Sequence, residues 1–150
     1  MTYNEYRIAK LRTYLFGIIT ALNTSTKQIN ANFLSNDINN YSLDKIPTES
    51  VITRWITGEE IHKDVYSFRS RVAYSQDTIN NLKNIGFFEQ FEKIIKSNNN
   101  EGVLPDINGI ESIECLNCGT LNNAETSTAE FYIQIQITYR ENLDEIITSL

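Results

Sequence analysis

The strongest constraint on the fold is a stretch near the C-terminal end in which apolar and polar side chains alternate residue by residue. Its apolar series is Phe131, Ile133, Ile135, Ile137 and Tyr139, and its polar series is Tyr132, Gln134, Gln136, Thr138 and Arg140. Successive side chains of a β-strand point to opposite faces, so this pattern predicts a strand with one face on a core and the other face more polar. Such strands are typical of an antiparallel sheet that is covered on one side.

The N-terminal region, residues 1–24, predicts a helix of about residues 3–22. Thr2 and Glu5 have the spacing of a capping box, in which both side chains accept hydrogen bonds from backbone amides of the first turn. Apolar residues then recur in steps of three and four: Ile8, Leu11, Leu15, Ile18 and Leu22. This periodicity is that of a helix with one buried face.

Residues 26–47 contain short alternating pieces among Asn, Asp and Ser residues. They predict one or two short strands and a loop. Pro47 ends the segment, which favours an edge strand or a turn over a central strand because proline cannot donate to a sheet.

Residues 48–73 predict the clearest hairpin. Its strands, 51–57 and 61–73, are rich in β-branched and aromatic residues. Gly58 and Glu59 between them suit a two-residue type II′ loop with glycine first. Because the second strand is long, we expect the hairpin to project beyond the sheet.

A second helix is expected over residues 75–97. Ser75 and Asp77 are suitable N-terminal residues, and apolar residues follow at helical spacing. Gly86 interrupts this pattern, which indicates either one kinked helix or two short ones. The polar run 97–100 is expected to end it.

A closing strand pair is expected over residues 110–140, with strands at 110–118 and 128–139 joined by a polar loop, and a helical tail over 141–150. The chain of 150 residues is the size of one domain. The order of elements predicts an α+β fold: a mostly antiparallel or mixed sheet, packed by an N-terminal and a central helix. We expect no secretory signal and no membrane span, since no apolar run is long enough.

The sequence offers little for catalysis, metal or cofactor binding. Cys115 and Cys118 form a single CxxC, and His62 is the only histidine, whereas structural zinc needs four ligands. Asp64 shares a strand face with His62, but two positions along a strand span about 6.5 Å, too far for a tight His–Asp pair. The six glycines form no phosphate-binding pattern. We therefore expect no metal, no cofactor and no enzymatic activity.

Charge is unevenly distributed along the chain. Residues 101–150 carry nine acidic residues and one basic residue, Arg140, a net charge of −8, which leaves +2 of the total −6 for residues 1–100. One interpretation is an ordinary solvated surface. The other is a subunit whose basic and acidic surfaces meet in neighbouring copies. The candidate interface residues are Arg54, Trp55, Lys63, Arg69 and Arg71 on the hairpin, and Glu111, Glu114 and Glu130 in the acidic half. The basic and aromatic hairpin also permits a nucleic-acid-binding module, although the acidic total charge disfavours it.

Several segments resemble one family of phage proteins. They are the Pro-Thr-Glu turn at 47–49, Phe68-Arg69-Ser70-Arg71-Val72-Ala73-Tyr74-Ser75-Gln76-Asp77, Gly86-Phe87-Phe88-Glu89-Gln90-Phe91, Gly102-Val103-Leu104-Pro105, and Thr128-Ala129-Glu130-Phe131-Tyr132-Ile133-Gln134-Ile135-Gln136. Together they resemble the tail terminator, or minor capsid, proteins encoded in head–tail gene blocks of phages and prophages of Gram-positive hosts. The resemblance covers about residues 47–140, and its motifs are structural patterns. Such proteins are sometimes labelled chloramphenicol resistance proteins, but the single histidine here is not in the HHxxxDG setting of that acetyltransferase.

The resemblance implies a structural virion protein at the head-proximal end of the tail, made in the host cytoplasm. Its subunits would form a ring, six-fold in the family, that caps the tail tube and stops its polymerisation. Its partners would be other copies of itself, the tail tube protein, the sheath where the tail is contractile, and the head-closure or connector protein. DNA would only pass through the lumen. The alternatives are a head-closure, connector or tube protein of the same particle and, from another class, a small cytoplasmic enzyme.

Overall fold

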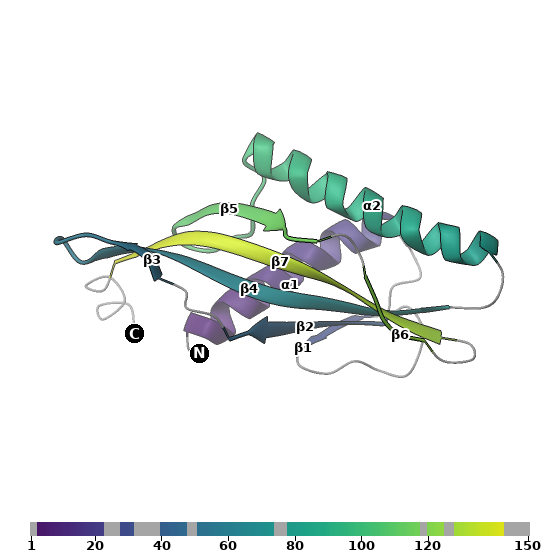
Figure 1. The fold of residues 1–150 in the computed structure, drawn as a ribbon. Helices are drawn as coiled ribbons and strands as arrows, with labels where there is room; N and C mark the ends of the chain where they lie inside the picture. Colours follow the sequence, from purple (N-terminus) through teal and green to yellow (C-terminus); the bar gives the residue numbers. More distant parts are fainter. Residues whose placement is uncertain are drawn as a thin grey trace.

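A computed structural model shows an α+β domain in which two helices pack on one face of a seven-stranded, mostly antiparallel sheet (Figure 1). The structure describes residues 3–22, 28–31, 40–47, 51–73, 78–117, 120–124 and 128–142. The elements are α1 (Tyr3–Leu22), β1 (Gln28–Ala31), β2 (Asn40–Ile46), β3 (Val51–Arg54), β4 (Glu59–Ala73), α2 (Thr78–Glu101), β5 (Ile110–Cys115), β6 (Thr120–Ala124) and β7 (Thr128–Asn142). Neither helix is long and apolar enough, over the described residues, to span a membrane.

Strands β4 and β7 form the centre of the sheet. Each has 15 residues, and they pair antiparallel along their whole length, from Glu59 opposite Asn142 to Ala73 opposite Thr128. The strand order is β1-β2-β4-β7-β5, with β3 also paired to β4 and β6 also paired to β7. Only the β1–β2 pair is parallel.

The alternation of β7 is confirmed. Ile133, Ile135 and Ile137 are fully buried, whereas Gln134 and Gln136 lie half-buried on the opposite face. Helix α2 contributes Phe91 to the same core, where its ring stacks on Phe68 of β4 at 5.4 Å. The sheet therefore has a core face covered by α1 and α2, and an open face that no helix of the described chain covers.

Helix α1 has the predicted bounds, and the predicted stripe is its packed face. Leu11, Leu15 and Ile18 are buried, and Ile8 and Leu22 are partly buried. The predicted capping residue Thr2 lies outside the described residues.

Helix α2 is one continuous helix that includes Gly86, which excludes the two-helix alternative, and Figure 1 shows it as a single unbroken ribbon. Its start at Ser75 lies outside the described residues. The asparagine run does not end it, as had been expected, because the helix continues to Glu101. Gly102, with φ of +76°, ends it: the Val103 amide donates to Asn98 O at 2.8 Å and the Gly102 amide to Asn99 O at 3.4 Å. These two bonds satisfy carbonyls that the helix leaves unpaired, as in a Schellman motif.

The hairpin turn differs from the predicted one. The Trp55 amide donates to Glu59 O at 2.9 Å and the Gly58 amide to Trp55 O at 3.1 Å, so the loop is 56–58 and Glu59 is already in β4. Gly58 has φ of +89°, as in a three-residue loop that ends in a left-handed residue. The predicted two-residue loop is therefore wrong, although glycine is needed at this position.

Three other sequence predictions need correction. The first segment does contain two strands, but only β1 is at the edge: β2 pairs with both β1 and β4, and Pro47 follows it outside the ladder. The polar loop predicted between the closing strands contains β6, which pairs with β7. Glu141 and Asn142 continue β7 rather than begin a helix, and 143–150 lie outside the described residues.

Candidate functional site

The β3–β4 turn forms the tip of a long arm that extends past the ends of both helices (Figure 1). Ile56 at its apex is completely exposed, with a relative accessibility of 107%, and the neighbouring Trp55 is 39% exposed. Arg54 in β3 flanks them, with its side chain 71% exposed. The tip thus presents apolar surface to solvent beside a basic side chain.

Ion pairs brace this tip from both sides. The Arg140 guanidinium lies 5.1 Å from the centre of the Trp55 ring and pairs with Glu59 at 3.5 Å and Glu111 at 3.3 Å. Arg54 pairs with Glu60 at 2.6 Å, and this hydrogen bond lowers the pKa of Glu60. The Arg140 guanidinium therefore covers part of the Trp55 ring at the base of the tip.

Arg69, Arg71 and Glu130 do not behave as expected for an interface between copies. They lie together on the open face, where Arg69 pairs with Asp44, and Glu130 pairs with Arg69 at 3.4 Å and with Arg71 at 4.0 Å. Arg69 also donates to the Ser42 hydroxyl at 3.4 Å. Glu130 is 8% exposed. These charges are paired within one chain because β4 and β7 place Arg71 directly opposite Glu130.

The remaining predicted residues are separated along the sheet. Lys63 is exposed on the open face of β4. Glu111 belongs to the tip through Arg140, and Glu114 on β5 accepts a hydrogen bond from Gln136 at 2.6 Å. The eight residues therefore form a tip group and an open-face group, with Lys63 and Glu114 apart, rather than one basic and one acidic surface.

A buried charge cluster on the core face was not predicted. Asp64 is 1% exposed; its Oδ2 accepts from the Tyr139 hydroxyl at 2.8 Å and lies 3.7 Å from Arg7 Nε and 3.8 Å from Lys45 Nζ. The Arg7 guanidinium also lies 4.6 Å from the centre of the Tyr139 ring. Burial, and then the Asp64 charge, raise the pKa values of Tyr66 and Tyr139. The cluster attaches the first turns of α1 to the sheet.

The sequence held a signal for this cluster. Arg7 precedes Leu11 by four residues and so lies on the apolar stripe of α1, and Asp64 alternates with Tyr66 and Phe68 on the core face of β4. A charged residue in an apolar series must find a partner when it is buried. That such partners meet each other was not visible in the sequence.

His62 lies at the end of this cluster without a geometry for proton transfer from a nucleophile. Its Nε2 contacts carboxylates of Glu60 at 3.3 Å and Glu141 at 3.1 Å, and its ring stacks on Tyr139 at 5.3 Å. The two carboxylates flank the ring nitrogen and orient it. Among the described residues no group of three or more potential ligands could hold a metal ion. Cys115 ends β5, and Cys118 lies outside the described residues.

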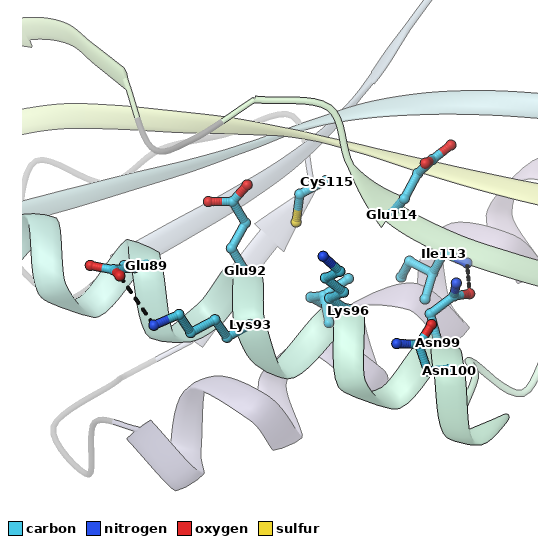
Figure 2. Close-up of a pocket in the computed structure, with 10 residues that line it drawn as sticks. Glu89, Glu92, Lys93, Lys96, Asn99, Asn100, Ile113, Glu114 and Cys115 are labelled. Carbon is cyan, nitrogen blue, oxygen red and sulfur yellow. Dashed lines mark hydrogen bonds and ion pairs between the residues drawn. The ribbon is translucent and has the colours of Figure 1, made fainter.

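A groove of about 520 Å³ runs between α2 and β5 (Figure 2). Its lining includes Cys115 and the core residues Ile95 and Ile113, which are 1% and 0% exposed, and its rim carries charged side chains of both signs. Asn99 lies at one end of the groove, where its side-chain oxygen accepts a hydrogen bond from the backbone amide of Ile113 in β5 at 2.9 Å. Figure 2 shows the Cys115 sulfur pointing toward α2. The remaining lining residues are Glu89, Glu92, Lys93, Lys96, Asn100 and Glu114.

No protein-family model matches this chain, and a search of curated proteins finds no match. The family resemblance of residues 47–140 therefore stays a prediction.

Proposed function

We propose that this chain is the subunit of a tail terminator. Its copies would form a ring that caps the tail tube of a phage or prophage particle and offers a surface to the head connector. Under this proposal its partners are its own copies, the tube protein, the sheath in a contractile tail and the connector. It belongs to the virion and is assembled in the host cytoplasm. The main support for this proposal is the projecting arm with its exposed apolar tip.

An exposed apolar tip on a projecting arm favours a structural assembly function. Burying an isoleucine side chain contributes about 1.5–3 kcal/mol. Ile56 forgoes this contribution in the isolated subunit because it is completely exposed. In a ring each subunit repeats the same contact, so this modest contribution is gained once per subunit. Bracing by Arg140 lowers the cost of ordering the tip on contact.

The buried cluster around Asp64 does not favour the alternative that the protein is an enzyme. Asp64 and Tyr139 are 1% and 3% exposed, so a substrate could not contact them without displacement of α1. Arg7 and Lys45 compensate the Asp64 charge in the folded subunit. A role in fixing α1 accounts for these contacts.

Oligomeric state and tail length together test the proposal. Light scattering and negative-stain microscopy of the purified protein should show closed rings of fixed size. Ile56→Asp should remain folded and lose the ring, whereas Phe16→Asp, at a 40% exposed site on α1, should keep it. Tails assembled without the protein should be overlong.

Different outcomes separate the alternatives. Long tubes formed by the purified protein alone would indicate a tube protein. Tails of normal length in the absence of this protein would show that the terminator proposal is wrong.

A further inference from the structure

We infer that strand β3 of each subunit pairs with strand β6 of the next copy of the same chain, so that the sheet continues from one subunit to the next. This inference rests on the proposed function, because it specifies which two surfaces form the ring. Both surfaces are backbone edges of the sheet, and the chain itself supplies the two halves of the pair.

Each helix occupies backbone groups on one edge of the sheet. The Arg12 guanidinium of α1 donates two hydrogen bonds to the Ile29 carbonyl of strand β1, at 3.0 and 2.5 Å. The Asn99 side chain of α2 accepts from the Ile113 amide of strand β5 at 2.9 Å. Exposed backbone groups of an edge strand pair readily with another chain, and covering groups prevent this. Strands β1 and β5, at the two ends of the strand order, are therefore poor sites for strand addition.

Strands β3 and β6 form the other two stretches of sheet edge. In the described parts of the chain, β3 pairs only with β4 and β6 only with β7. Figure 1 shows them at opposite ends of the ribbon that β4 and β7 form: β3 lies beside residues 60–62 of β4, and β6 beside residues 129–132 of β7. Because they also flank different central strands, the two edges lie at diagonally opposite corners of the sheet.

The directions of the two strands suit a pair between copies in the same orientation. Strand β3 is antiparallel to β4, β4 to β7, and β7 to β6, so β3 and β6 run in opposite directions. A neighbour in the same orientation would therefore place its β6 antiparallel to β3, as in most of the sheet. The strands also match in length, with four and five residues. This head-to-tail contact closes into a ring when the rotation between copies permits.

The hydrogen bonds of the hairpin show which amide of β3 faces the neighbour. The Trp55 amide donates to Glu59 O of β4 at 2.9 Å. Backbone groups of consecutive residues in an antiparallel strand point to opposite sides, so the Arg54 amide points away from β4. Proline lacks this amide and is tolerated on the outer side of an edge strand. Arg54→Pro should therefore block the β3 edge and keep the pairing with β4.

The same reasoning identifies an outward amide of β6. The Leu116 amide donates to Gln134 O of β7 at 2.8 Å, so Gln134 bonds toward the side of β5 and β6. Glu130, four residues earlier, bonds toward the same side, and Asn123 of β6 is its partner. The next residue, Ala124, therefore directs its amide away from β7. Ala124→Pro should block the β6 edge and keep the pairing with β7.

The two proline variants test the inference by light scattering of the purified protein. Arg54→Pro and Ala124→Pro should each remain folded by circular dichroism and lose the ring. Arg54→Ala is the matched control: it also loses the ion pair with Glu60 but keeps the amide, so it should form rings. Wild-type alanine is the control at position 124.

Mixing the two variants makes the test specific for a head-to-tail pair. Each variant keeps one intact edge, so the β6 edge of Arg54→Pro can pair with the β3 edge of Ala124→Pro. The mixture should therefore form dimers of one copy each and nothing larger, while each variant alone stays monomeric. A two-fold pair between two β3 strands would instead leave Ala124→Pro dimeric on its own.

Hydrogen exchange of the wild-type protein tests the same contact without proline. Residues 51–54 and 120–124 should exchange more slowly in the ring than in dilute, dissociated protein, whereas residues 110–115 should not change. The inference is overturned if rings persist in both folded proline variants, if Ala124→Pro alone dimerises, or if assembly slows exchange in neither segment. If the wild-type protein forms no ring, the proposed function itself fails.

Discussion

Two clusters on opposite faces of β4 show how the same charged groups act in different surroundings. On the core face, Asp64 lies between Arg7 and Lys45; on the open face, Glu130 lies between Arg69 and Arg71. The Asp64 side chain is 1% exposed under α1, whereas the Arg69 side chain is 28% exposed to solvent. Removing the buried Asp64 charge leaves its partners uncompensated, whereas water can solvate Arg69 or its partners when that pair is broken.

The comparison predicts its largest effect at Asp64. Asp64→Ala leaves the buried Arg7 with only the more distant carboxylate of Glu141, at 3.9 Å, and should lower the free energy of unfolding by about 3–5 kcal/mol. Asp64→Asn is the matched control, because it keeps an acceptor for Tyr139 and should cost less. Urea unfolding measures both. A loss below about 1 kcal/mol for the alanine variant would mean that this cluster does not hold α1.

The two faces of β7 allow the same comparison without charge. Ile135→Ala should cost about 2–5 kcal/mol, since Ile135 is fully buried and its truncation leaves a cavity. Gln134→Ala, on the half-buried opposite face, should change stability by about 0.5 kcal/mol or less. Thermal unfolding distinguishes the two. An unchanged melting temperature for Ile135→Ala would show that the register is wrong.

The core-face tyrosines predict a pH dependence. Burial, and then the Asp64 charge, raise the pKa values of Tyr66 and Tyr139 above the ordinary value of 10.0. Their contribution to stability is complete below pH 10 and is lost as the pH rises further, because only the unfolded chain then releases these protons. Ultraviolet titration should show that Tyr66 and Tyr139 ionise only as the protein unfolds. A double substitution, Tyr66→Phe with Tyr139→Phe, should reduce this dependence, and ionisation of both in the folded protein would contradict it.

The open-face pairs of Arg69 should contribute less. Arg69→Ala should cost about 1 kcal/mol or less, because this side chain is 28% exposed, and the loss should shrink at high salt. The loss for Asp64→Ala should not shrink, because salt does not reach a buried pair. Equal salt dependence at both sites would remove the distinction between the faces. Replacing Arg69 and Arg71 with glutamate would bring four acidic residues together: the two new glutamates, Asp44 and Glu130. This double variant would disturb the fold and is a poor test of assembly, so Ile56→Asp is a better one.

The smallest effect is expected at the cysteines. Cys115→Ser with Cys118→Ser should fold with little loss of stability, because we expect no metal at this CxxC. Metal analysis of protein purified without added zinc checks this. Stoichiometric zinc that disappears in the double variant would contradict the expectation.

What could be predicted from the sequence was local. The stripe of α1 and the alternation of β7 are patterns within one element, and both elements were found. Strand β6 has no alternating pattern of its own and exists through its pairing with β7, so it was missed. The charge clusters depend on the register between strands far apart in sequence: nothing local indicates that Arg71 is opposite Glu130. The candidate interface residues were therefore predicted without the intrachain partners that the structure shows for Arg69, Arg71 and Glu130.

The ladder between β4 and β7 also sets when this chain can fold during its synthesis. Its nearest paired residues, Ala73 and Thr128, are about 55 residues apart. At about 5–20 residues per second, a ribosome needs about 3–11 s between them. During this interval β4 lacks its longest partner, and the side chains of Tyr66 and Phe68 lack the cover of β7. The core is completed only after translation of the C-terminal strand, so a premature stop before or early in β7 would release a chain that cannot bury its central strand.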